Sequence, residues 1–254
     1  MTPALTLFAP ERLPEIAAGD DLAAIILAAL GSEGLALADG DVIVLAQKIV
    51  SKAEGRRLAL AEVTPGAEAE RLAARCGKEP ALVELILRES AEVLRCVPGV
   101  LIVRHRLGFV LANAGIDRSN IAGAAGHALL LPEDPDASAA TLRGGLMAAT
   151  GKTLAVVIND SFGRAWRLGT CGICIGAAGI APLLDLRGAT DRFGRALQSS
   201  ELAYADEIAA AASLVMGQAG EGRPVVVVRG LAPVDAAPAP AAALIRPTAT
   251  DLFP

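Results

Sequence analysis

The order of apolar and polar positions predicts alternating strands and helices along most of this 254-residue chain. Short continuous apolar runs are typical of buried strands, whereas apolar residues spaced at helical intervals predict helices. The first helix is expected to have Asp20 or Asp21 as its N-cap. The expected strands are 6–10, 42–46, 100–103, 107–112, 154–158 and 225–228, and the expected helices are 21–30, 65–76, 79–95, 138–150 and 203–216.

Polar segments follow several of these apolar runs. Residues 47–56 are expected to form a polar loop after a buried strand, and two acidic turns are expected at 113–120 and 159–164. The two turns contain Asp117 and Asp160, each flanked by hydroxyl and amide side chains. Carboxylate, hydroxyl and amide oxygens are the ligands that hard divalent cations prefer. An aspartate at a strand end can also be only a turn former or a helix cap, so this pattern alone leaves both interpretations open.

Composition and charge narrow the class of protein. Hydrophobic residues make up 53% of the chain and aromatic residues only 3%, which predicts an aliphatic core. The formal charge of -5 disfavours binding to nucleic acid. No run approaches the roughly 18 apolar residues of a membrane span, and the first residues lack a basic secretory start. We therefore expect a cytoplasmic protein that binds neither membrane nor nucleic acid.

Several familiar chemistries do not fit the chain. Residues 145–153 resemble a P-loop but have five residues between the glycines instead of four, and they lead from a helix into a strand. Only His105 and His127 are present, which disfavours a histidine-based nucleophilic mechanism. Cys171 and Cys174 form a CxxC pair that could bind zinc or act in redox chemistry, but small buried residues are the simpler interpretation. Metal-assisted phosphoryl or acyl-phosphate chemistry remains.

Five segments, taken together and in this order, resemble one family. The resemblance is to the coenzyme F420-0:L-glutamate ligase family (F420 gamma-glutamyl ligases) in its stand-alone form, and it extends from about residue 5 to 232. Ala165 departs from the family pattern, which often has proline there, and Gln218 stands where glutamate also occurs. The five segments are 46–56, 113–120, 160–167 with Gly169, Asp206 with Glu207, and 216–224.

This resemblance implies a GTP-dependent ligase that adds L-glutamate to coenzyme F420-0 and could add further γ-linked glutamates. GTP would convert the acceptor carboxylate to an acyl phosphate, and the amine of glutamate would then displace phosphate. The family uses two divalent ions, Mg²⁺ or Mn²⁺, with K⁺ as a further candidate, and it forms a homodimer.

The resemblance also implies roles for individual residues. Asp117, Asp160 and Arg164 are the expected catalytic residues. Asp117 and Asp160 would bind one divalent ion, whereas Ser161 and Gln218 would contribute to a second. The expected GTP-binding residues are Leu13, Pro14, Glu15, Ile16, Gln47, Lys48, Lys52, Asn120, Met216, Gly217, Gln218, Ala219, Gly220, Glu221, Gly222 and Arg223.

For the architecture, we expect a mixed α/β (α+β) protein with two lobes and the family's non-Rossmann fold. Residues 1–232 would form the ligase-like domain, and residues 233–254, rich in Pro and Ala, would form an extended and loosely packed tail. Two alternatives remain open from the sequence. One is a sister ligase that amidates a different carboxylate, and the other is a non-catalytic nucleotide- or metal-binding protein of the same fold.

Overall fold

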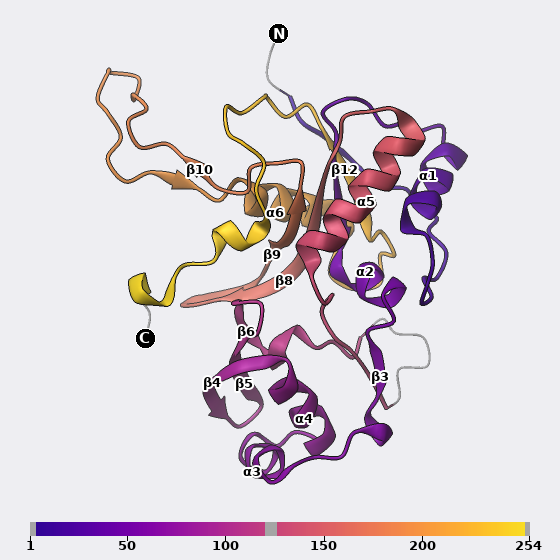
Figure 1. The fold of residues 1–254 in the computed structure, drawn as a ribbon, viewed down its shortest axis with the longest axis vertical. Helices are drawn as coiled ribbons and strands as arrows, with labels where there is room; N and C mark the ends of the chain where they lie inside the picture. Colours follow the sequence, from indigo (N-terminus) through magenta and orange to yellow (C-terminus); the bar gives the residue numbers. More distant parts are fainter. Residues whose placement is uncertain (1–3, 120–125, 252–254) are drawn as a thin grey trace.

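The structure is a computed structural model that describes residues 4–119 and 126–251. Its fold is mixed α/β, as expected, and its centre is a five-stranded sheet in the order β1-β12-β2-β8-β9 (Figure 1). Strands β2 and β8 are parallel, whereas the other neighbouring pairs are antiparallel. The strands are β1 (Thr6–Phe8), β12 (Val225–Arg229), β2 (Val42–Ala46), β8 (Ala155–Arg164) and β9 (Arg167–Ala178).

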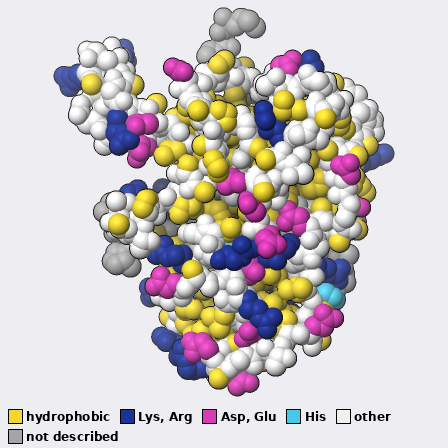
Figure 2. All heavy atoms as spheres, in the orientation of Figure 1, with side chains coloured by type: hydrophobic (Ala, Val, Ile, Leu, Met, Phe, Trp, Pro, Cys, Tyr) yellow, Lys and Arg dark blue, Asp and Glu magenta, His cyan; other side chains and the backbone are white. Residues whose placement is uncertain are grey.

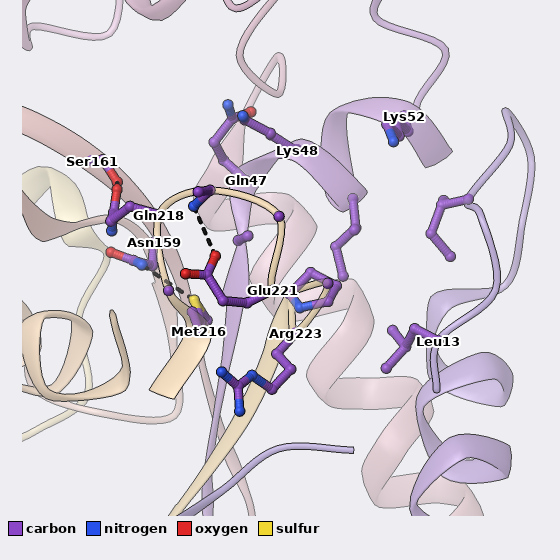
Figure 3. A pocket seen from close by; sticks show the side chains of 18 of the residues that line it. Leu13, Gln47, Lys48, Lys52, Asn159, Ser161, Met216, Gln218, Glu221 and Arg223 are labelled. Atoms are coloured by element: carbon purple, nitrogen blue, oxygen red, sulfur yellow. Dashed lines mark hydrogen bonds between the residues drawn. The ribbon is translucent and has the colours of Figure 1, made fainter. Parts of the chain in front are cut away.

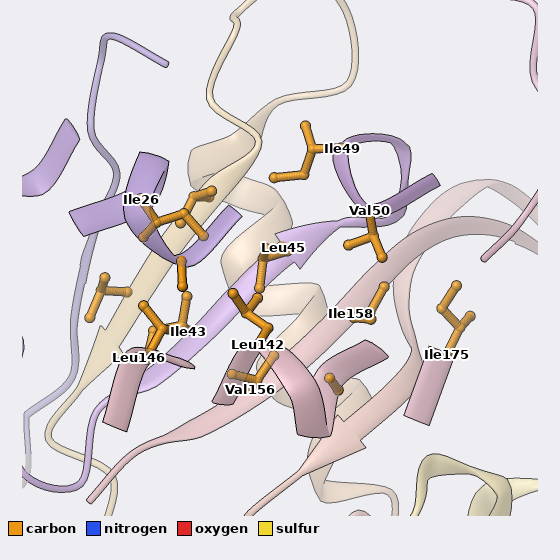
Figure 4. Close-up of a cluster of buried hydrophobic side chains, with 14 of the residues drawn as sticks. Ile26, Ile43, Leu45, Ile49, Val50, Leu142, Leu146, Val156, Ile158 and Ile175 are labelled. Carbon is orange, nitrogen blue, oxygen red and sulfur yellow. The ribbon is translucent and has the colours of Figure 1, made fainter. Parts of the chain in front are cut away.

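Helices cover both faces of this sheet. Helices α1 (Leu22–Ser32) and α5 (Pro135–Thr150) pack on one face, and α6 (Tyr204–Met216) packs on the other. Alternate residues of β2 point to opposite faces. Ile43 and Leu45 join the cluster under α1 and α5 (Figure 4), whereas Val42 and Val44 join the cluster under α6. Because both faces are covered, the strand is apolar at every position.

A second lobe lies below the sheet in Figure 1 and has its own hydrophobic cluster. Two helices pack there against a three-stranded antiparallel sheet, and a short β3-β7 pair lies where the chain enters and leaves the lobe. The elements are β3 (Arg57–Ala59), η1 (Leu60–Glu62), α3 (Ala67–Cys76), α4 (Pro80–Arg88), β4 (Ser90–Val97), β5 (Val100–His105), β6 (Val110–Ala112), η2 (Asn113–Gly115) and β7 (His127–Leu129).

Buried charges tie this lobe to the rest of the molecule. The Glu89 carboxylate is 2.9 Å from Arg56 Nη2, 3.2 Å from Arg106 Nε and 3.4 Å from His105 Nε2. Arg56 also donates through Nε to the carbonyl oxygen of Leu131 at 2.9 Å. Burial alone would raise the pKa of Glu89, but contact with His105 and the charges of both arginines hold it at about 2. Acidic and basic side chains gather where the two lobes meet (Figure 2).

Two further segments extend from the sheet. An arm containing β10 (Leu184–Asp185) and β11 (Glu201–Leu202) projects from the body (Figure 1). The C-terminal segment contains η3 (Ala241–Leu244) and η4 (Thr248–Thr250). The prediction of a loosely packed tail was wrong for its middle part. Ala241 is fully buried, and its amide donates to Asp136 at 2.7 Å.

The structure corrects three local predictions. Residues 47–56 are not an irregular loop, because they begin with helix α2 (Gln47–Ala53). The helix expected over 79–95 ends at Arg88, and residues 90–97 pair with β5 as strand β4. Residues 159–164 are not a turn, because β8 continues to Arg164 while it pairs with β9. In the described ranges, no helix is both long and apolar enough to cross a membrane.

Candidate functional site

A cavity of about 570 Å³ lies where the carboxyl end of β2 meets the middle of β8 (Figure 3). The parallel register places Ala46 opposite Asn159, so α2 and the distal half of β8 both begin at the same edge of the sheet. The glycine-rich loop after α6 and the segment before α1 close the other sides. Its volume falls within the usual range for small-ligand pockets. The lining residues are 13–16, 46–49, Lys52, 159–161 and 216–224.

Asp117 is held in place by its own turn. The backbone amide and the hydroxyl of Ser119 both donate to Asp117 Oδ1, at 2.6 and 2.8 Å. The other oxygen, Oδ2, is 2.7 Å from Lys48 Nζ. Burial raises the pKa of Asp117, but the bonds from Lys48 and Ser119 outweigh burial and bring it below its ordinary value. Asp117 is therefore an ionised carboxylate with one oxygen directed towards a cation.

The pKa of Asp160 is shifted in the opposite direction, above its ordinary value. Burial is the largest influence and, together with the nearby charge of Asp117, it raises the pKa of Asp160 to about 6. The amide of Ser161, 2.8 Å from Asp160 Oδ1, and the charge of Lys48 oppose this shift only in part. Two carboxylates near one another and near a single ammonium group have an excess of negative charge. A divalent cation would offset that charge.

Ser161 and Gln218 supply further oxygen atoms next to Asp160. The Ser161 hydroxyl donates to Gln218 Oε1 at 2.6 Å, which joins β8 to the glycine-rich loop. Carboxylate, hydroxyl and amide oxygens suit Mg²⁺ or Mn²⁺ and are a poor set for zinc or copper. Within the described residues, no group of three or more His, Cys, Asp or Glu side chains could hold a metal ion. A metal bound here would therefore depend on the serine and glutamine as well as the two aspartates.

The cavity also contains groups that suit an anionic ligand. Lys52 Nζ is 2.6 Å from Glu15 Oε1 at one side of the cavity. Gln47 accepts the Ser51 hydroxyl at 2.9 Å, and in the described part of the chain its buried Nε2 has no hydrogen-bond partner. The same holds for the buried Nε of Arg223. These donors and the two lysines fit the phosphates and polar edges of a nucleotide.

Gly217 shapes the loop that closes the cavity. Its φ of +73° is in the left-handed region, and a Cβ atom there would collide with the carboxylate of Glu221. That carboxylate accepts the amide of Ala219 at 2.8 Å, which folds the loop back on itself. Only glycine allows this turn without strain.

Most of the predicted nucleotide-binding residues lie together. All of them except Asn120 line the cavity, and Asn120 lies outside the described residues. Asp160, Ser161 and Gln218 also line it, and Asp117 adjoins it through Lys48. Arg164 does not line the cavity, because it lies at the β8-β9 turn, where it donates to the carbonyl oxygen of Leu168 at 3.1 Å. Its catalytic role stays a prediction.

Sequence reasoning assigned no role to two residues that the structure places in the site. Asn159 lines the cavity and donates to Ser213 Oγ at 3.0 Å, and Ser119 orients Asp117. Both belong to the acidic segments, so their polar side chains were the available signal. Cys171 and Cys174 form no disulfide, and the interpretation as buried residues fits Cys174, whereas Cys171 is only partly buried.

A second cavity, of about 850 Å³, lies between α1, α2 and α5. Four of its acidic side chains, those of Asp20, Asp21, Glu54 and Asp134, already have protein partners. Asp21 and Asp134 cap helices α1 and α5, and Glu54 accepts from the Ser138 hydroxyl and the Glu133 amide. The first cavity is therefore the candidate site.

The fold and this site define a class of protein: a mixed α/β protein with a nucleotide-sized cavity bordered by Asp117, Asp160 and two lysines. Residues 11–230 match the family model described as F420-0:Gamma-glutamyl ligase. The chain belongs to this family, which confirms the resemblance found in the sequence.

Similar proteins carry the same family name. The chain is 49% identical over 226 residues to the coenzyme F420:L-glutamate ligase of Methanothermobacter thermautotrophicus, with 89% of each chain covered. It is 44% identical over 238 residues to the protein of that name from Methanopyrus kandleri, with 92% of each chain covered. The corresponding protein of Archaeoglobus fulgidus is 45% identical over 225 residues, which cover 89% of this chain and 87% of that one.

Proposed function

We propose that this protein is a GTP-dependent ligase that joins L-glutamate to coenzyme F420-0. The observation that carries the proposal is the meeting of Asp117, Asp160 and Lys48 at a nucleotide-sized cavity lined by the family's glycine-rich loop. The family description names F420-0, and the relatives' names give coenzyme F420 and L-glutamate. GTP and the acyl-phosphate route are proposals that the family resemblance implies, and the oxygen-rich site beside the two lysines supports a divalent metal and a phosphate ligand.

In the proposed reaction, the acceptor carboxylate attacks the γ-phosphorus of GTP, and the bond from that phosphorus to the bridging oxygen breaks to release GDP. The glutamate amine then attacks the acyl carbon, the carbon–oxygen bond to phosphate breaks, and the amine loses a proton. Mg²⁺ or Mn²⁺ would neutralise the negative charge that both steps accumulate. Asp117, Asp160, Ser161 and Gln218 would hold the metal ions.

The chain's own groups would bind and orient the substrates. The ammonium group of Lys52 can pair with a phosphate after it releases Glu15, and Gln47 Nε2 can donate a hydrogen bond to the nucleotide. Gly217 and its neighbours let the loop backbone approach the ligand closely. Holding the reacting groups in a fixed arrangement removes much of the entropic cost of the two displacements.

The direct test is mass spectrometry of the products. We expect purified protein incubated with F420-0, L-glutamate, GTP and Mn²⁺ to add one or more glutamyl units to F420-0. Omission of any one component should stop the addition. No mass increase in the complete mixture, with GTP binding intact, would contradict the proposed acceptor and favour a sister ligase that amidates another carboxylate.

We also propose a homodimer. Support comes from large apolar side chains that the single chain leaves exposed: Trp166 and Leu168 at the β8-β9 turn are 82% and 98% exposed, and Phe193 on the projecting arm is 76% exposed. Such residues on protruding segments are typical of association surfaces. Sedimentation equilibrium should give twice the chain mass, and Leu168→Asp together with Phe193→Asp should shift it towards the monomer. A monomeric wild-type protein would contradict this proposal.

A further inference from the structure

Lys48 occupies the oxygen of Asp117 that a metal would need. Asp117 Oδ1 already accepts two bonds from Ser119, so Oδ2 is the oxygen left for a further ligand. Lys48 Nζ lies 2.7 Å from this Oδ2 and 3.0 Å from the Ser119 hydroxyl. An ammonium group and a divalent ion at one carboxylate oxygen repel each other, so each weakens the contact that the other makes.

We propose that Lys48 and the divalent metal compete for Asp117. When the nucleotide binds, one of its phosphates accepts the ammonium group of Lys48 and so leaves Asp117 to the metal. This inference rests on the proposed function, since it takes the metal and the nucleotide from there. The metal replaces Lys48 at Asp117 Oδ2, and Lys48 turns to a phosphate oxygen in the cavity. Lys48 is thus a positioning residue that couples the binding of metal and nucleotide.

The surroundings of Lys48 allow this exchange. The side chains of Lys48 and Asp117 are 25% and 27% exposed, so the pair is held by a contact that water can reach. Lys48 also lines the cavity, so its flexible four-carbon stem can direct the ammonium group inward without movement of α2. The charges of Lys48 and Asp117 both affect the pKa of Asp160, so the three groups lie close enough to interact electrostatically.

The exchange has a thermodynamic consequence. Without nucleotide, the metal must displace Lys48 from Asp117, which lowers its affinity for the protein. With nucleotide, the displaced ammonium group has a new partner, so the metal binds more tightly. Because coupling between two ligands is reciprocal, the metal must strengthen nucleotide binding by the same factor.

Lys52 provides a matched control. It lies one helical turn after Lys48 on α2 and lines the same cavity (Figure 3). Its partner is Glu15, at 2.6 Å, and not Asp117. Replacing either lysine by methionine removes one positive charge from the same cavity, but only Lys48→Met frees Asp117.

The test is a titration of the full-length protein with Mn²⁺ in the absence of nucleotide. Electron paramagnetic resonance measures the concentration of free Mn²⁺ at each step. We expect Lys48→Met to bind Mn²⁺ about tenfold more tightly than wild type, because the competing cation is gone. Lys52→Met should change the affinity by less than about threefold, since the charge of Lys52 is paired with Glu15 and does not contact Asp117. GTP binding, measured with excess Mn²⁺ and without acceptor, should weaken in both variants.

In Lys48→Met, a higher affinity for Mn²⁺ together with a lower affinity for GTP identifies the exchange. Damage to the fold would lower both affinities. Circular dichroism and a second variant, Lys48→Gln, guard against misfolding. Equal Mn²⁺ affinity in wild type, Lys48→Met and Lys48→Gln would overturn the exchange while leaving the proposed ligase intact. Absence of Mn²⁺ binding in all variants and in wild type would overturn both the exchange and the metal site.

Discussion

Replacing Asp160 with asparagine is expected to lower the rate of glutamate addition by about a thousandfold or more, because the substitution removes a charged metal ligand at the reacting phosphate. The fold should persist. Burial raises the pKa of Asp160 to about 6, so the native state favours the protonated form more than the unfolded chain does. This costs stability as the pH rises from the ordinary value of 3.8 towards 6. The neutral amide of the variant would avoid that cost at pH 7.

The measurement therefore compares the rate of glutamate addition and the stability to urea between wild type and Asp160→Asn. In metal-free buffer at pH 7, Asp160→Asn should unfold at the same or a higher urea concentration than wild type. Mn²⁺ should raise the melting temperature of wild type but not of the variant. Asp39→Asn is the control, because Asp39 pairs with Lys152 on an exposed turn outside the cavity. Full activity of Asp160→Asn would contradict the metal role.

Replacing Glu89 with glutamine should destabilise the fold markedly, although the residue lies outside the cavity. The substitution leaves Arg56 and Arg106, whose side chains are 20% and 34% exposed, without the charge of the buried Glu89 carboxylate. Breaking a fully buried ion pair by removing one partner costs about 3 to 5 kcal/mol, and the partial exposure of both arginines places the expected loss at about 2 kcal/mol. Urea unfolding at pH 7, followed by circular dichroism, measures this loss.

The same pair of proteins should differ in pH dependence. The folded-state pKa of Glu89, about 2, lies below its ordinary value of 4.5. Its stabilising effect is therefore fully present above pH 4.5 and is lost as the pH falls from 4.5 towards 2. The gap in stability between wild type and Glu89→Gln should shrink over this window. Glu68→Gln, which breaks an exposed pair with Arg71, should change stability little at any pH. A constant gap would show that charge is not the cause.

Elements with strong local signals were predictable from the sequence. Asp21 caps α1 as expected, and its side chain accepts the Ala24 amide at 3.1 Å. Residues 42–46 form the buried strand that their apolar run predicts. α5 begins after the Asp134 cap and ends at Gly151, which has a left-handed conformation. Caps, continuous apolar runs and glycine at helix ends act within a few residues, so a local pattern is enough to reveal them.

Elements that depend on distant pairing were predicted less well. Residues 90–95 were expected to continue the helix that begins at residue 79, but residues 90–97 pair with β5 and form a strand. Asp160 was expected in a turn, yet pairing with β9 extends β8 beyond it. Helix α2 was missed because its charged residues obscure the apolar pair Ile49 and Val50, and because no side chain caps its first turn. In the two strands, contacts outside the segment outweigh its local preference.

For the site, the sequence by itself determined the chemical inventory. Two aspartates with neighbouring hydroxyl and amide groups, lysines and a glycine-rich loop indicated metal and phosphate chemistry, and the five segments identified the family. Charge and residue type are properties of each side chain alone, so they can be read without a fold.

Only the tertiary structure decided which of these groups meet. The parallel pairing of β2 with β8 places Asn159 and Asp160 beside α2, more than a hundred residues earlier in the chain. Two ion pairs likewise join distant segments: Lys48 with Asp117, and Arg56 with Glu89. The spacing of these residues in the sequence does not predict either pair. The physical reason is that an ion pair acts through a few ångströms of space, and that distance is set by the packing of the whole chain.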